Sequence, residues 1–361
     1  NMDLILNILK YRHYGFIYIN PRLDNNQRVG YYGSDYFTQG TYNEDDQRRA
    51  YYYGVVFGGL SMKVVFLGGG QWGLFPLKML LQKEHVTGIV ASVKDPLIVR
   101  EGLKNRIPTC KIVDRHEPQF EAFLRACSPD IIIVAGFPFI LPPKILDIPI
   151  KGIINLHGSL LPAYRGPQPL EWQIINGEKI AGVTVHFIDE DIDSGDILMQ
   201  AEVPILETDT LKTMALKLGN KGWRLLKDTL ARFKKGPVQG IPQKHHLSSY
   251  YGKITEADRK IDWTSGRMAI FNLVRALPPY APAFSDLENV RCHIYRLRSV
   301  TSKPSGMPGQ ILCQPSVSHP MIICTSDGDV AVFKYTLSGR NGRKLSRETA
   351  NDMLSPGSFF S

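Results

Sequence analysis

The stretch that decides the fold is residues 63–73, which read KVVFLGGGQWG. Its first half is an unbroken apolar run with the length and composition of a buried strand. Its second half fits the pattern Gly-x-Gly-x-x-Gly, with Gly68, Gly70 and Gly73 as the glycines, and a predicted helix over residues 73–82 follows. This stretch therefore predicts a strand, a tight turn and a helix in direct succession.

Strands and helices continue to alternate on its C-terminal side. We expect strands at residues 86–91, 130–136, 151–156, 181–188 and 197–203, and helices at residues 117–127, 168–176 and 210–233. This alternation is typical of an α/β fold with a doubly wound, mostly parallel, Rossmann-like sheet. After residue 236, Pro, Gly and Ser separate short predicted strands at residues 292–300, 309–313, 321–324 and 330–335, which indicate a small C-terminal β-barrel.

These patterns divide the chain into four parts. The predicted parts are an N-terminal extension (1–61), a main α/β domain (62–240), a linker region (241–285) and a β-barrel-like domain (286–361). We interpret the extension as an appended segment that packs on the main fold or on a second subunit, which leaves a homodimer open.

Composition limits the class of protein. The 361 residues are 43% hydrophobic and 21% charged, as in globular chains. The five cysteines are scattered without Cys-x-x-Cys spacing, so we expect no zinc or other metal site and a reducing, cytoplasmic compartment. No apolar run is long enough to predict a membrane span. The net charge of +9 suits an anionic partner such as tRNA or a pyrophosphate-linked sugar, although solubility explains it equally well.

Residues 155–162, NLHGSLLP, contain the strongest functional signal. Asn155 and His157 are two apart, so on a strand both side chains lie on one face. The glycine and proline that follow indicate a strand end, where sites on parallel sheets are found. Asp193, in the stretch DIDSGD at residues 191–196, can supply a carboxylate that orients the histidine. Taken singly, each of these residues also has an ordinary structural explanation.

The chain resembles the folate-dependent formyltransferases from about residue 62 to about residue 333. The stretches that carry the resemblance are NLHGSLLP (155–162), YRGP (164–167), GVTVHF (182–187) and DIDSGDIL (191–198). The resemblance implies an enzyme that moves a formyl group from N10-formyltetrahydrofolate to an amine, and an oligonucleotide/oligosaccharide-type (OB-like) barrel at the C-terminus. The family's catalytic asparagine, histidine and aspartate match Asn155, His157 and Asp193.

The implied reaction is acyl transfer, in which negative charge develops on the formyl oxygen. Asn155 and protonated His157 would donate hydrogen bonds to that oxygen, or neutral His157 would take the proton of the amine. Asp193 would fix the orientation of the imidazole ring. We expect His186, seven residues before Asp193, to be structural or to support these groups.

Two loops are implied to line the folate site, one after the third predicted strand and one before Asp193. Ordinary packing remains an alternative for each side chain of the first loop. The residues in question are Phe137, Phe139, Ile140, Leu141, Glu190 and Asp191.

The glycine turn is not predicted to bind a nicotinamide dinucleotide. The second predicted strand ends in ASVK at residues 91–94, without an acid for a ribose hydroxyl. We therefore assign Gly70, Gln71 and Trp72 to close packing or to contact with the amine acceptor. Arg165 is expected to bind a folate glutamate or an acceptor phosphate, with a loop salt bridge as the alternative.

The acceptor separates two branches of the family. Methionyl-tRNA formyltransferases usually carry a concentrated basic insertion after the second strand, whereas residues 92–106 here hold four dispersed basic residues. We therefore expect a nucleotide-linked amino sugar as acceptor, with methionyl-tRNA as the alternative. A carbohydrate- or nucleic-acid-binding module with an inactive catalytic domain is a third interpretation, and the intact catalytic set argues against it.

Overall fold

The computed structural model describes residues 7–10, 17–20, 62–300, 302–316, 319–339, 343, 345 and 353–360. The chain divides into two compact units, residues 1–61 and residues 62–361. In the first unit, β1 (Asn7–Lys10) and β2 (Ile17–Asn20) pair antiparallel. We predicted that this extension packs on the main fold or on a second subunit. That prediction concerns residues that lie mostly outside the described ones. None of the helices described is both long and apolar enough to span a lipid bilayer.

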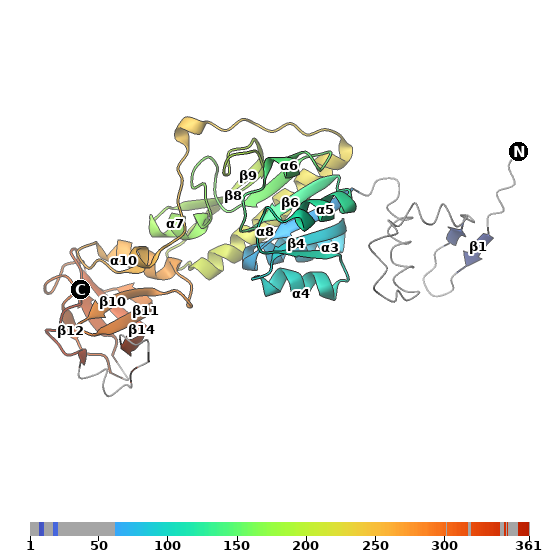
Figure 1. Cartoon of the computed structure of the whole chain (residues 1–361). Coiled ribbons are helices and arrows are strands. Elements are labelled where there is room, and N and C mark those ends of the chain that lie inside the picture. Colours follow the sequence, from blue (N-terminus) through green and yellow to red (C-terminus); the bar gives the residue numbers. More distant parts are fainter. Residues whose placement is uncertain are drawn as a thin grey trace, which may run out of the picture. The chain divides into compact units, whose positions relative to one another are not determined.

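A seven-stranded sheet in the order β5-β4-β3-β6-β7-β8-β9 forms the first part of the second unit (Figure 1). Its strands are β3 (Lys63–Gly68), β4 (His85–Ser92), β5 (Thr109–Ile112), β6 (Ile131–Ala135), β7 (Ile153–His157), β8 (Ile180–Phe187) and β9 (Ile197–Pro204). The pairs among β3 to β7 are parallel, and β8 is antiparallel to both of its neighbours. The prediction of a doubly wound, mostly parallel sheet is confirmed.

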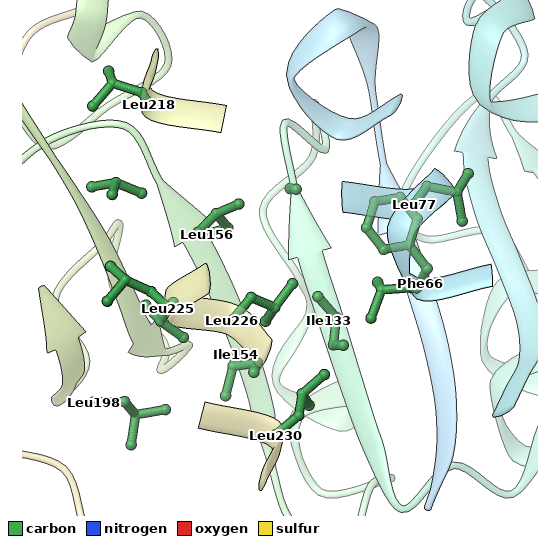
Figure 2. Close-up of a cluster of buried hydrophobic side chains, with 14 of the residues drawn as sticks. Phe66, Leu77, Ile133, Ile154, Leu156, Leu198, Leu218, Leu225, Leu226 and Leu230 are labelled. Carbon is green, nitrogen blue, oxygen red and sulfur yellow. The ribbon is translucent and has the colours of Figure 1, made fainter. Parts of the chain in front are cut away.

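Apolar helix faces cover both sides of this sheet. The helices on one side are α3 (Gly70–Lys83), α4 (Pro96–Lys104), α7 (Pro169–Ile175) and α8 (Leu211–Lys235), and those on the other are α5 (Pro118–Cys127) and α6 (Pro143–Leu146). Figure 2 shows the first side, where Leu226 and Leu230 of α8 lie in one buried cluster with Ile154 of β7. Since each such side chain contributes about 1.5–3 kcal/mol when buried, α8 holds the strand that carries the catalytic candidates.

The direction of the strand order changes between β3 and β6. The chain continues from β3 to β4 and β5 on one side, and from β6 to β7 on the other. Gly69 and Gly136 follow the ends of β3 and β6, and a Cβ atom on Gly69 would lie 2.3 Å from the carbonyl oxygen of Gly136. Only glycine permits this approach of the two turns. Ligands of open α/β sheets bind in the crevice at such a switch point, and β7 lies beside it.

A five-stranded antiparallel sheet in the order β10-β11-β14-β13-β12 forms the C-terminal part. Its strands are β10 (Ala283–Leu287), β11 (Val290–Ser299), β12 (Ile311–Cys313), β13 (Met321–Cys324) and β14 (Asp329–Gly339). Helix α10 (Arg267–Ala276) packs into its core, and η1 (His245–Leu247) and α9 (Glu256–Arg259) precede that helix. The predicted small barrel is confirmed as a half-barrel.

Candidate active site

Strand β7 and the loop after β8 bring the three predicted catalytic residues together. Asn155 and His157 lie on β7, and Asp193 lies in the loop between β8 and β9. The Oδ1 atom of Asp193 accepts a hydrogen bond from Asn155 Nδ2 at 3.3 Å. Its Oδ2 atom lies 3.6 Å from His157 Nδ1. The alternation of side chains on a strand, read from residues two apart, therefore places the amide and the imidazole beside one carboxylate.

His157 is held by a hydrogen bond at one ring nitrogen, and its other ring nitrogen lies near the Asp193 carboxylate. Its side chain is buried, and Nε2 lies 2.9 Å from the carbonyl oxygen of Tyr164. A carbonyl oxygen accepts hydrogen bonds only, so Nε2 carries a hydrogen and Nδ1 faces the carboxylate. The loop that follows β7 thus returns to fix the histidine.

Asp193 is the negative centre of the site. Burial alone raises the pKa of Asp193, but His157, His186 and the Gly166 N–H, which donates to Oδ2 at 2.9 Å, together outweigh burial and lower that pKa. The side chain is therefore ionised at neutral pH. Its backbone φ of 51° lies in the left-handed region, which non-glycine residues adopt at a cost of about 1–3 kcal/mol, commonly at functional sites.

His186 completes the cluster from β8, opposite Asn155. Its Nδ1 donates to its neighbour's carbonyl oxygen, that of Phe187, at 2.7 Å, so its Nε2 accepts from Asn155 Nδ2 at 3.2 Å. Burial, and then the nearby His157, lower the pKa of His186 to about 4 although Asp193 opposes the change. His186 is therefore a neutral acceptor that orients the amide of Asn155.

The amide nitrogen of Asn155 is placed to serve a substrate carbonyl. Its two hydrogens point to His186 and Asp193 across 3.2 and 3.3 Å, which are long and therefore weak bonds. A carbonyl oxygen that enters the crevice can compete for one of these hydrogens. The cluster thus offers a donor to a developing oxyanion and an imidazole next to a carboxylate, which are the groups that acyl transfer uses.

The loops predicted to line the folate site contain both packed and exposed side chains. Phe137 and Phe139 are half-buried and pack edge to face with ring centroids 5.4 Å apart, and Ile188 packs against the same core cluster. Ile140, by contrast, is 48% exposed and Ile192 is 40% exposed. The remaining candidates divide in the same way: Leu141 is buried in the core, whereas Glu190 and Asp191 are exposed.

The glycine turn contacts β7 through Trp72. Its Nε1 donates to the carbonyl oxygen of Leu156 at 2.9 Å, between the two candidate positions of β7, Asn155 and His157. Gln71 is exposed. The N–H of Gly70 donates to Asp95 Oδ2, and this same carboxylate caps the N-terminus of α4. A protein carboxylate therefore already occupies the donor that a phosphate would use at this turn.

Arg165 lies beside the cluster and pairs with a residue that the sequence analysis did not identify. Its guanidinium donates to Gln243 Oε1 at 2.7 Å and lies 3.1 Å from Nδ1 of His245. Its Nε atom is buried and has no hydrogen-bond partner among the described residues. The loop salt bridge considered for Arg165 is thus replaced by an amide contact.

In the part of the chain that the structure describes, no group of three or more His, Cys, Asp or Glu side chains is arranged to hold a metal ion.

A doubly wound sheet in which an inner strand, β7, ends in an amide and an imidazole beside a carboxylate has the arrangement of a group-transfer enzyme of the acyl-transfer type. Comparison with known proteins identifies the family. Residues 62–230 match the family described as formyl transferase, and residues 253–347 match its C-terminal domain. The chain belongs to the formyltransferase family, and it is a folate-dependent enzyme of one-carbon transfer.

Similar curated proteins cover most of the chain. The methionyl-tRNA formyltransferase of Thermodesulfovibrio yellowstonii is 32% identical over 307 residues, which cover 82% of this chain and 96% of that protein. The methionyl-tRNA formyltransferase of Clostridium beijerinckii is 33% identical over 299 residues and covers 80% of this chain and 95% of its own. The resemblance to folate-dependent formyltransferases is therefore confirmed.

Solved structures share the fold at lower identity. HypX from Aquifex aeolicus superposes with a TM-score of 0.60 at 20% identity and covers 81% of this chain and 49% of its own. The N-formyltransferase from Helicobacter canadensis, solved with folinic acid and dTDP-3-aminofucose, gives a TM-score of 0.59 at 20% identity and covers 76% of this chain and all of its own (100%).

Proposed function

We propose that this formyltransferase transfers the formyl group of N10-formyltetrahydrofolate to the amino group of methionyl-tRNA. The observation that carries the proposal is the identity of 32–33% to methionyl-tRNA formyltransferases over about four fifths of the chain, including the C-terminal part. An amino-sugar nucleotide, the acceptor expected from the sequence, has weaker support, because the sugar-modifying neighbour is similar in fold at only 20% identity.

One face of the C-terminal sheet has the composition of a nucleic-acid-binding surface. The guanidinium groups of Arg296 and Arg298 on β11 lie 5.4 and 5.6 Å from the ring centroid of Phe333 on β14, and all three side chains are exposed. Beside them, Lys334 lies 5.7 Å from the ring centroid of Tyr295. Cationic groups that alternate with aromatic rings bind phosphates and stack on unpaired bases. We call these five residues the basic-aromatic face.

The region that favoured a sugar acceptor, residues 92–106, also presents positive charge that a tRNA can contact. Residues 92–106 form the end of β4, a turn and helix α4, whose apolar side packs into the main core through Ile98. Their four basic side chains are all exposed, so the region presents positive charge although it lacks a concentrated insertion. These side chains belong to Lys94, Arg100, Lys104 and Arg106.

The residues of the active site support the same reaction for any amine. N10-formyltetrahydrofolate supplies the formyl group when it is bound, and the exposed Ile140 and Ile192 are suited to cover its flat ring. The Asn155 amide donates to the formyl oxygen as negative charge develops there. Nδ1 of His157 is the ring nitrogen that takes the proton of the attacking amine, because the Tyr164 carbonyl oxygen holds Nε2, and the Asp193 carboxylate lies beside that Nδ1.

An acceptor assay tests the proposal. The protein is incubated with N10-formyltetrahydrofolate and either methionyl-tRNA or a panel of amino-sugar nucleotides, and release of tetrahydrofolate is measured at several salt concentrations. We expect formylation of methionyl-tRNA with a KM that rises steeply with salt. Replacing Arg296 and Arg298 by Ala should raise this KM and reduce its salt slope by about 1 per lost phosphate contact.

The matched control replaces two exposed basic residues of α8, Arg224 and Lys227, by Ala. For this control, the salt dependence of the KM should stay closer to that of the parent protein than it does in the variant without Arg296 and Arg298. Efficient formylation of a sugar nucleotide with no formylation of methionyl-tRNA would refute the proposed acceptor.

A further inference from the structure

The segment that follows α8 runs back over the active-site loops before it reaches α10, and Figure 1 draws it in yellow. We call residues 237–253 the strap. Near its start, Ile241 exchanges two backbone hydrogen bonds of 2.8 Å with Ile197 at the beginning of β9. Near its end, the Arg165 N–H donates to Ser249 at 2.8 Å, and the Tyr251 N–H donates to the Arg165 carbonyl at 2.9 Å. The strap is therefore attached to β9 near its start and to the loop of Arg165 near its end.

Gln243 lies between these two attachments and points into the protein. Its side chain is 5% exposed, whereas its neighbour Lys244 is exposed. The Nε2 atom of Gln243 donates to the carbonyl oxygen of Asp193 at 2.9 Å and to that of Gly195 at 2.7 Å. Its Oε1 atom accepts from the guanidinium of Arg165 at 2.7 Å. Both amide hydrogens and the amide oxygen are thus used.

The two carbonyl groups that Gln243 binds lie directly after the strained φ torsion of Asp193, at Asp193 itself and at Gly195. Asp193 has a φ of 51°, and a backbone in this region persists only where surrounding contacts hold it. The same residue must direct one carboxylate oxygen to His157 and the other to Asn155. A small rotation of the loop would move both oxygens, and displacements of about 1 Å at such groups can cost about a hundredfold in rate.

We propose that Gln243 is a positioning residue of the transferase, which holds the backbone of Asp193 so that its carboxylate stays between His157 and Asn155. A strap residue from outside the sheet thereby fixes the loop whose carboxylate faces Asn155 and His157 of β7. The same amide, through its oxygen, holds Arg165 at the edge of the site. This inference rests on the proposed role of Asp193 in formyl transfer.

One substitution separates the contact of Gln243 with Arg165 from its contacts with the loop of Asp193. Gln243→Glu keeps an oxygen that can accept from Arg165, but it replaces the nitrogen donor by a second oxygen that faces the carbonyl groups of Asp193 and Gly195. We expect kcat for formyl transfer to fall about 10- to 100-fold, with little change in the KM of the amine acceptor. Lys244→Ala, one residue further along the strap, is the matched control and should retain the parent kcat.

A double-variant cycle distinguishes positioning from a general stabilising role. If Gln243 acts through Asp193, then Gln243→Glu lowers kcat strongly in the parent protein and hardly at all in an Asp193→Asn background. The thermal midpoints of all variants are measured alongside to confirm that each is folded. Parent-like kcat in folded Gln243→Glu, or an equal fold-loss in both backgrounds, would overturn the inference. Parent-like kcat in Asp193→Asn would instead overturn the catalytic role of Asp193 itself.

Discussion

The buried His186 should make the protein less stable in mild acid, by an amount that the structure allows us to work out. Burial, then the nearby His157, lower the pKa of His186 from 6.5 to about 4, with Asp193 opposing. In the unfolded chain this histidine takes up a proton as pH falls through 6.5, whereas in the folded chain it does so only near pH 4. The unfolded state therefore binds more protons throughout this window, and stability is lost as pH falls across it.

The size of the effect follows from about 1.4 kcal/mol per pKa unit for one proton. Between pH 6.5 and pH 4.5, His186 alone should lower the free energy of unfolding by roughly 2 kcal/mol. The carboxylate of Asp193 does not contribute in this window. Its pKa in the folded protein lies below the ordinary value of 3.8, so the stability that it provides is lost only as the pH falls below about that value. Burial also lowers the pKa values of His85 and His293, so the contribution of His186 has to be isolated by substitution.

The variant His186→Gln provides that isolation, since it keeps an acceptor for the amide of Asn155 and cannot be protonated. Urea unfolding followed by tryptophan fluorescence gives the free energy of unfolding of both proteins at intervals from pH 7 to pH 4.5. We expect the parent protein to lose stability more steeply than the variant, by roughly 2 kcal/mol over the window. Parallel curves for the two proteins would refute the argument that His186 is buried in its neutral form.

Two further predictions concern the catalytic strand. Asn155→Ala and His157→Ala should keep the fold and lose at least about a hundredfold in kcat, the usual scale for removal of an oxyanion donor; parent-like turnover in a folded His157→Ala protein would exclude the assignment. Trp72→Phe removes the hydrogen bond to the backbone of β7. It should lower the free energy of unfolding, measured in urea, by about 1 kcal/mol. An unchanged free energy would show that this bond does not hold the strand.

The sequence predicts the parts of this fold in which a local pattern coincides with burial. The apolar runs of β3 and β6 are buried, and both are recognised as strands from composition alone. Strand β5 (Thr109–Ile112) and strand β10 (Ala283–Leu287) are missed, because they are short and mix polar with apolar residues. The antiparallel direction of β8 is also not readable, since it depends on the pairing of strands and not on their composition.

The same contrast applies to the site. Asn155 and His157 can be found from a spacing of two, since strand geometry converts that spacing into proximity. Asp193 is identified from the resemblance and from its loop, but its left-handed backbone is not written in any local pattern. Gln243 lies 50 residues beyond Asp193 in a polar stretch, and only the folded chain shows that its side chain is buried against the loop of Asp193.

The C-terminal half of the protein is joined to the main α/β part through two connections. The strap carries Gln243 to the loop of Asp193, as described above. Helix α10 supplies the second connection: its Val274 packs in the C-terminal core, and the guanidinium of Arg275 donates to the carbonyl oxygens of Leu206 and Asp209, between β9 and α8, at 2.7 and 3.0 Å. If the proposed acceptor binds on the basic-aromatic face, it is held by a C-terminal sheet that is joined to the main α/β part in this way. Because the amine must reach the formyl carbon within a few ångströms and in a defined direction, a transferase with a large acceptor benefits from such fixed connections more than one with a small acceptor does.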